Sequence, residues 1–405
     1  MILFILFSFI FHIPTPFALC DTPFIELTFD ETNDAFNIMV PIGSNTRQNF
    51  FDINLKSHIT FTSPFYFNKQ NSDSIQTLTP LTQCYIYNPQ QQIPSQLLSD
   101  YFYFQNEYLN ITDVHFYHLN SNNDIYDSFS FNPTPLSQHH SLTHLLYASH
   151  RIRKLQFTLL FHGAKGSIFF GETPELIYNK YPHNTTIPIK PNSTFWEFQL
   201  LGTQVQIANT KQYKTLKHNA QRSSVVFQTT HKEIYAPKNV MKYLNETFFL
   251  PRVKTKQCEY IYYERTFTCN CDAVVSFPNI RFILNHNYTI YTISHYNYYD
   301  DFMTITQCRF LLRENKADVD SWEIGTAILS EHAYTFNYAE QHVTFHSKTA
   351  FIHASPAEMI NDTTHHAQQL LLVNTLLLAL TTTFIFFVST RNTYITHIHL
   401  TLINK

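Results

Sequence analysis

Apolar and polar positions alternate in short runs along most of the chain, and turns separate the runs. The clearest runs are residues 36–43, 155–161, 166–171, 195–200, 322–329 and 336–345. Several of them end at a glycine, and the turn 338–341 joins the halves of the last run. An alternation of period two is typical of strands with one buried face. The pattern therefore predicts an all-β protein.

The two ends of the chain carry longer apolar segments. Residues 2–13 are apolar and precede Ala18-Leu19-Cys20, which suits cleavage before Asp21. Residues 370–388 are long enough to span a bilayer, and Arg391 follows, as in a cytoplasmic tail. We expect a signal peptide at 1–20, a stalk at 351–369, a transmembrane helix at 370–388 and a cytoplasmic tail at 389–405. A buried core helix at 370–388 is the alternative.

Sequons for N-glycosylation agree with this topology, because all precede the predicted span. They stand at Asn110, Asn184, Asn192, Asn245, Asn287 and Asn361. The chain is thus expected to enter the secretory pathway as a glycosylated, single-pass type I membrane protein of the cell surface or an endolysosomal membrane.

Composition changes this picture little. The net charge is −3 and no basic run is present, so a nucleic-acid partner is not expected. The chain has 38 Phe and 25 Tyr but only 6 Gly, where average usage would give roughly 28. Few positions are therefore free to adopt the turns that glycine permits.

The final run resembles the end of the pepsin-like aspartic peptidases, a family that includes the cathepsin D-like enzymes. Trp322, Gly325, Phe336 and Val343 match the family pattern. The hairpin 157–171 and the strand 195–200 are also similar to family segments, whereas residues 65–150 match poorly. The resemblance implies a bilobal fold, with an N-terminal β lobe at 21–194 and a C-terminal β lobe at 195–350.

Enzymes of that family need one D-T/S-G loop per lobe, and the two aspartates share a proton. This chain has no Asp two residues before any glycine. The resemblance places Asn54 at the first aspartate, or Leu55 if one residue is inserted; a third register uses Asp52. It places Gln228 at the second aspartate. Both acids are therefore expected to be lost.

The expected function follows from that loss. We predict a membrane-anchored, degenerate family member without peptidase activity, which binds a peptide or protein ligand in the cleft between its lobes or serves as a surface ectodomain. The alternative is an active aspartic endopeptidase with atypical catalytic loops, for example one that uses Asp52. No cofactor is expected.

The resemblance also implies a disulfide between Cys271 and Cys308. Cys258 and Cys269 could close a neighbouring hairpin, which would leave Cys84 unpaired.

Two further patterns are weaker. His140 and His144 have the spacing of zinc ligands on a helix, but no third ligand is evident and no metal site is predicted. The tyrosine-rich stretches 260–263 and 296–299 could form a binding face, with strand packing as the default interpretation.

Overall fold

The structure is a computed structural model of the chain. It describes residues 22–30, 35–44, 47–64, 70, 72–79, 82–85, 92–104, 109–119, 127–133, 141–162, 165–208, 210–216, 223–284, 289–293, 299–304, 307–315, 320–330 and 332–353. All of them belong to one compact unit, Met1–His353. The predicted signal peptide, stalk, transmembrane helix and tail lie outside the described residues, apart from 351–353 of the stalk.

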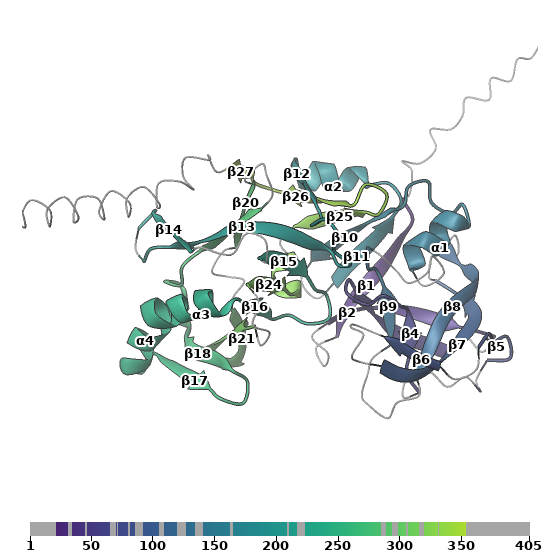
Figure 1. Cartoon of the computed structure of the whole chain (residues 1–405), viewed down its shortest axis with the longest axis horizontal. Helices are drawn as coiled ribbons and strands as arrows, with labels where there is room; N and C mark the ends of the chain where they lie inside the picture. The colour runs from purple at the N-terminus through teal and green to yellow at the C-terminus, as the bar shows by residue number, and fades with distance from the viewer. Residues whose placement is uncertain are drawn as a thin grey trace, which may run out of the picture. The chain divides into compact units, whose positions relative to one another are not determined.

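The first lobe is built mainly from strands (Figure 1). Its strands are β1 (Phe24–Asp30), β2 (Ala35–Ile42), β3 (Arg47–Asn54), β4 (Phe61–Thr62), β5 (Gln76–Thr77), β6 (Thr82–Tyr85), β7 (Gln92–Phe102), β8 (Ile111–Leu119), β9 (Ser128–Ser130), β10 (Gln156–His162), β11 (Lys165–Phe170) and β12 (His183–Pro188). Its helices are α1 (Leu142–Ala148) and α2 (Glu175–Lys180).

The second lobe adds shorter strands and most of the helices. Its strands are β13 (Glu197–Gln206), β14 (Tyr213–Leu216), β15 (Ser224–Phe227), β16 (Ile234–Ala236), β17 (Cys258–Ile261), β18 (Thr266–Asn270), β19 (Ile280–Leu284), β20 (Thr289–Ile293), β21 (Tyr299–Thr304), β22 (Gln307–Phe310), β23 (Leu312–Glu314), β24 (Ser321–Ile324), β25 (Ala333–Asn337), β26 (His342–Ser347) and β27 (Ile352–His353). Its helices are α3 (Lys238–Leu244), the π-helix η4 (Asn245–Phe249), α4 (Leu250–Lys254), α5 (Cys271–Val274) and α6 (Thr326–Leu329).

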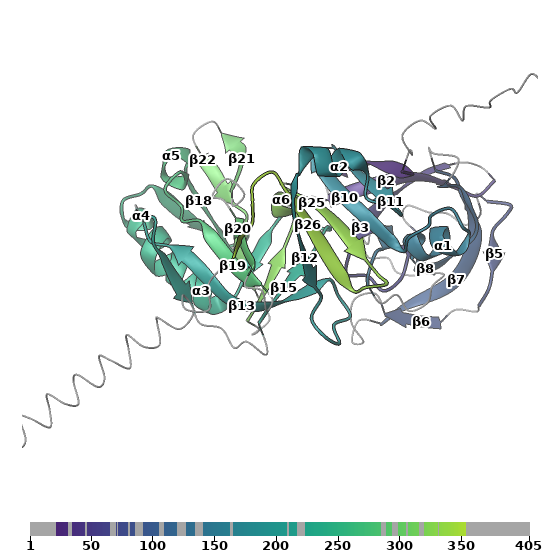
Figure 2. The ribbon, with the colours of Figure 1, turned by 90° about the horizontal axis from the view of Figure 1, so that it is seen from above.

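A sheet of 14 strands joins the two lobes, in the order β12-β26-β25-β10-β11-β1-β2-β3-β9-β4-β8-β7-β5, with β6 on β7. β25 and β26 come from the end of the unit, yet β25 pairs with β10 of the first lobe. Figure 2 shows β10, β25 and β26 between the first-lobe strands and the rest of the second lobe. The hairpins predicted at 157–171 and 336–345 are confirmed as β10–β11 and β25–β26.

The other two sheets belong to the second lobe. Nine strands follow the order β23-β16-β24-β15-β13-β19-β20-β27, with β14 on β13, and four follow β17-β18-β22-β21. One buried core extends through both lobes. Phe157 of the first lobe stacks on Phe336, with ring centroids 4.7 Å apart, and Trp196 meets Phe336 edge-on at 5.0 Å. Aromatic packing of this kind fixes the lobes on a common core.

The described cysteines of the second lobe form two disulfides, Cys258–Cys269 and Cys271–Cys308. The first closes the β17–β18 hairpin, and the second ties α5 to β22. The side chain of Cys84 lies outside the described residues. No helix in the described ranges is both long enough and apolar enough to cross a bilayer.

Candidate functional site

The two candidate loops, which contain Asn54 and Gln228, each follow a strand that belongs to a parallel pair, one pair in each lobe. In the first lobe β3 runs parallel to β9, and Ile53 lies opposite Phe129. In the second lobe β15 runs parallel to β24, and Phe227 lies opposite Ile324. The residue that follows Ile53 is Asn54, and the residue that follows Phe227 is Gln228. The fold therefore brings the two sequence-predicted positions to equivalent places at the ends of equivalent strands.

The first loop closes on the side chain of Asn54, which is fully buried. Its Oδ1 accepts hydrogen bonds from the backbone N–H of Lys56 at 2.9 Å and of Ser57 at 2.8 Å. Ser130 of β9 stabilises the turn, because its hydroxyl donates a hydrogen bond to the carbonyl of Ser57 at 2.6 Å. Leu55, the alternative first position, is a buried core residue. The short Asn54 side chain thus supplies the acceptor that the turn needs.

The second loop is held by its backbone instead. The N–H of Gln228 donates to the carbonyl of Ile324 at 2.9 Å. Its Oε1 is buried and has no hydrogen-bond partner in the described part of the chain. Gly325 permits close packing: a Cβ there would collide with the backbone carbonyl oxygens of Glu233 and His231. The glycine predicted from the family pattern is therefore required by backbone contact.

Three contacts join the loops and the strands around them. The Thr229 hydroxyl, next to Gln228, donates to the carbonyl of Ile53 in the opposite lobe. Lys56 of the first loop extends its Nζ to 3.4 Å from Oε1 of Glu323 on β24. The indole N–H of Trp196 donates to the carbonyl of Phe131 at 2.6 Å. The sequence-based interpretation missed the Lys56–Glu323 pair, because no sequence spacing links two residues so far apart.

The arrangement limits the chemistry of the two loops. Amide side chains donate and accept hydrogen bonds, but they do not take up a proton in the physiological range. General base catalysis needs a group whose pKa lies near the working pH. Asn54 and Gln228 therefore suit a hydrogen-bonded contact and not the activation of water.

Two carboxyl groups do lie nearby, both in the first lobe. Burial, reinforced by the charge of Asp30, raises the pKa of Asp52 on β3 to about 7. Burial raises the pKa of Asp127 well above its usual range, and the charge of Asp52 adds to the rise. The Ser63 N–H, which donates to Oδ1 of Asp127 at 2.6 Å, acts in the opposite direction and lowers the pKa. The N–H of Asp52 donates to the Asp127 carbonyl at 2.8 Å. Asp127 is fully buried, and its Oδ2 has no partner among the described residues.

Charged residues of the second lobe surround the second loop. Glu233 pairs with Arg313 at 2.7 Å and lies 3.9 Å from Nδ1 of His231. Burial lowers the pKa of His231, although Glu233 and Glu323 pull it the other way. His231 is therefore neutral at neutral pH. It is a packing and hydrogen-bonding residue beside the loop.

The weaker sequence signals lead to no metal site within the described residues. His140 lies outside them, and α1 begins only at Leu142. His144 packs edge-on against Tyr338, with ring centroids 4.7 Å apart, and burial lowers its pKa. Of the two histidines the structure thus places only His144, which is a packing residue.

Among the predicted glycosylation sites, Asn184 and Asn192 are exposed. Asn110 and Asn245 are half-buried, and Oδ1 of Asn110 accepts from the Phe104 N–H at 2.7 Å. Asn287 and Asn361 lie outside the described residues.

The chain was compared with families and structures of known proteins. A family model described as eukaryotic aspartyl protease matches residues 126–348, more than half of the chain. The crystal structure of basic 7S globulin from soybean matches with a TM-score of 0.61 at 12% identity, over 81% of this chain and 97% of that one. No curated protein matches significantly.

The mostly-β, two-lobed architecture is thus the pepsin-like fold. The chain belongs to the eukaryotic aspartyl protease family.

Proposed function

We propose that this family member binds peptide or protein ligands between its lobes without cleaving them. The proposal is supported by the pair of amide side chains, Asn54 and Gln228, which lie at equivalent strand ends of the two lobes and which the resemblance aligns with the family's aspartates. In the first loop the amide oxygen already accepts two backbone N–H groups. Neither side chain can act as the general base for water.

The surrounding scaffold supports a binding role. The lobes remain joined through Thr229, Lys56 and Glu323 at the loops. The Oε1 of Gln228 lacks a partner in the described structure but is itself buried, so a rotation of this side chain toward the ligand would let it accept a hydrogen bond from a ligand amide. A peptide backbone supplies such donors at every residue except proline.

The proposal includes the cellular setting expected from the sequence. A signal peptide at 1–20 and a transmembrane helix at 370–388 would present the two lobes as a glycosylated ectodomain. The two disulfides of the second lobe support an oxidising compartment, where such bonds persist.

One observation favours the alternative of an active peptidase. Asp52 and Asp127 are neighbouring buried acids with raised pKa values, as in a pair that shares a proton. Both, however, belong to the first lobe, and Asp127 is fully buried with one carboxyl oxygen held by the Ser63 N–H. A substrate carbonyl would have to reach a group that solvent does not reach, so binding without cleavage is the better account.

A peptide-capture experiment tests the proposal. The purified full-length chain is mixed with unmodified ten-residue peptides at pH 4 and pH 7, and the bound peptides are recovered and identified by mass spectrometry. We expect intact peptides, and a changed set of peptides with the variant Gln228→Ala. Recovery of cleavage products alone, or of no peptide above a heat-denatured sample, would overturn the proposal.

A further inference from the structure

A groove in the second lobe lies between a helical segment and a disulfide-closed hairpin. The helical segment is the continuous run α3–η4–α4, and the hairpin is β17–β18. Between them is a cavity of about 960 Å³. It is lined by Lys238, Met241, Lys242, Asn245, Leu250, Val253, Tyr260, Tyr262, Arg265, Phe267, Glu314 and Asn315. None of these residues belongs to the loops that carry Asn54 and Gln228.

The floor of the groove is apolar, and an exposed tyrosine of the hairpin, Tyr262, lines it. Met241 and Phe267 are buried in the floor, and Phe267 stacks on Phe249 with centroids 4.0 Å apart. At the hairpin tip Tyr262 is 84% exposed and Tyr263 is 82% exposed. Tyrosines of this kind offer a large contact area at a low cost in conformational entropy. Their exposure is not explained by packing within the lobe.

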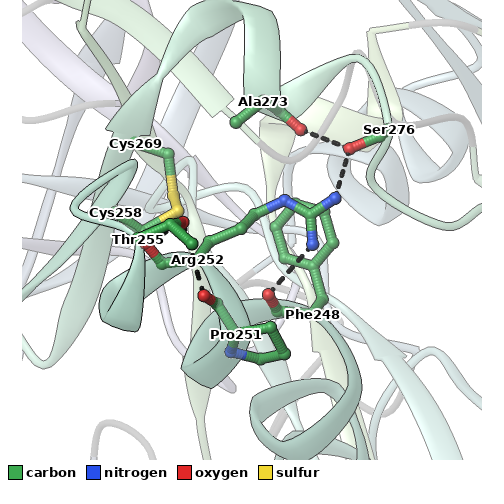
Figure 3. The surroundings of a disulfide bond; sticks show 8 residues. All are labelled: Phe248, Pro251, Arg252, Thr255, Cys258, Cys269, Ala273 and Ser276. Carbon is green, nitrogen blue, oxygen red and sulfur yellow. Dashed lines mark hydrogen bonds between the residues drawn. A yellow bond between two sulfur atoms is a disulfide. The ribbon is translucent and has the colours of Figure 1, made fainter.

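The groove is braced by covalent and polar contacts (Figure 3). The Cys258–Cys269 disulfide closes the hairpin at its base. Behind it, Arg252 covers the Phe248 ring at 3.8 Å and donates to the Ser276 hydroxyl at 2.6 Å. One wall includes the five-residue π-helix η4, and π-helical turns occur frequently at functional sites. A rigid surface loses little freedom when a partner binds.

The charge of the groove is predominantly positive. Lys238, Lys242 and Arg265 line it, and Glu314 is the one acidic residue among the described residues of the lining. In the part of the chain that the structure describes, no carboxylate pairs with any of these three cations. Three cations that pair with no described carboxylate, beside an apolar floor, are complementary to an acidic segment that carries an apolar side chain.

We propose that this groove docks an acidic peptide segment of a partner protein, with an apolar or aromatic side chain of the segment on Met241 and Phe267 and its carboxylates on Lys238, Lys242 and Arg265. Tyr262 closes over the segment from the hairpin tip. The site lies apart from the loops between the lobes, so it does not depend on the proposed function of those loops.

A labelled peptide tests the proposal. The probe is a synthetic twelve-residue peptide of glutamates around a central Leu-Trp pair; its partner probe has lysines in place of the glutamates. Binding to the full-length glycosylated chain is measured by fluorescence anisotropy. We expect the acidic peptide to bind and the basic peptide not to bind. The double variant Lys242→Glu/Arg265→Glu should weaken binding about tenfold or more, and Tyr262→Ala about fivefold.

The matched control is Lys211→Glu, an exposed lysine of the same lobe outside the groove, which should leave binding unchanged. Equal loss in this control would reveal diffuse charge attraction and overturn the proposal, as would equal binding of the basic peptide. The sequon at Asn245 gives a third outcome, since Asn245 lines the groove. If the acidic peptide binds only after enzymatic removal of N-glycans, a glycan on Asn245 occupies the groove and the proposal is wrong.

Discussion

The loops at Asn54 and Gln228 occupy equivalent positions in the two lobes but are stabilised in different ways. Asn54 folds back and accepts two N–H groups of its own loop. Gln228 is one methylene longer, and its buried Oε1 accepts no hydrogen bond in the described structure. The difference teaches that, of the two amides, only Asn54 has a structural role in its own loop.

The support beneath the loops differs in the same way. Ser130 and Gly325 occupy equivalent positions. Ser130 follows Phe129, which pairs with Ile53, and Gly325 follows Ile324, which pairs with Phe227. Ser130 donates to the Ser57 carbonyl, whereas Gly325 leaves room for the carbonyls of His231 and Glu233. The first loop depends on side-chain hydrogen bonds, and the second depends on the absence of a side chain.

The largest effect should come from Gly325→Ala. The new Cβ would meet backbone atoms that cannot move away, so we expect a loss of about 3 kcal/mol or more in the free energy of unfolding. The matched control is Gly202→Ala, whose Cβ would meet only side chains at 3.5 Å or more. Urea unfolding compares the two variants. Equal midpoints would contradict the close packing of the second loop.

The next largest effect is a pH dependence of the free energy of unfolding, which comes from Asp52 in the first lobe. Asp52 stands where the second lobe has Val226, and burial raises its pKa to about 7. The folded state therefore binds a proton that the unfolded chain releases near pH 4, so the stability is full below that pH and declines as the pH rises through 7. We expect about 3 kcal/mol less stability at pH 8 than at pH 4 from this group.

The variant Asp52→Asn should remove the contribution of Asp52 to the decline and leave that of Asp127, whose pKa is also raised by burial, while the exposed control Asp73→Asn should retain both. Thermal unfolding from pH 4 to pH 8 measures both. An unchanged decline in Asp52→Asn would assign the pH dependence to Asp127 or to another group.

A smaller difference should separate the two amides. Asn54→Ala leaves the N–H groups of Lys56 and Ser57 without their acceptor in a buried site, at a cost of about 2 kcal/mol. Gln228→Ala removes an oxygen that accepts nothing in the described structure, and should cost less than about 1 kcal/mol. Paired urea titrations test this order. A reversed order would show that the second amide, and not the first, holds its loop.

The smallest effect should come from the ion pair between the lobes. The side chains of Lys56 and Glu323 are about one quarter exposed, so solvent screens them and Lys56→Met should cost about 0.5 kcal/mol. The loss should shrink in 1 M salt, where such pairs are screened. A salt-independent loss would mean that Lys56 acts through its packing near the Phe195 ring.

Much of this account could be predicted from sequence. Alternation and the retained Trp322, Gly325 and Val343 predict the strands and the family, because these residues serve backbone and core packing. The roles of Asp127 and of the Lys56–Glu323 pair could not be predicted, since both arise from contacts between strands distant in the chain. For the groove beside β17–β18, the sequence shows only a tyrosine-rich stretch at 260–263, and strand packing is the default interpretation of such a stretch.

The most direct test of the central claim is inhibitor-sensitive hydrolysis of a denatured protein by the purified chain, from pH 3 to pH 7.5. A transition-state inhibitor of the family provides the reference. With amides at Asn54 and Gln228, we predict no hydrolysis above that of a heat-inactivated sample at any pH. Inhibitor-sensitive hydrolysis that disappears in Asp52→Asn or Asp127→Asn would contradict the claim and identify those acids as the catalytic pair.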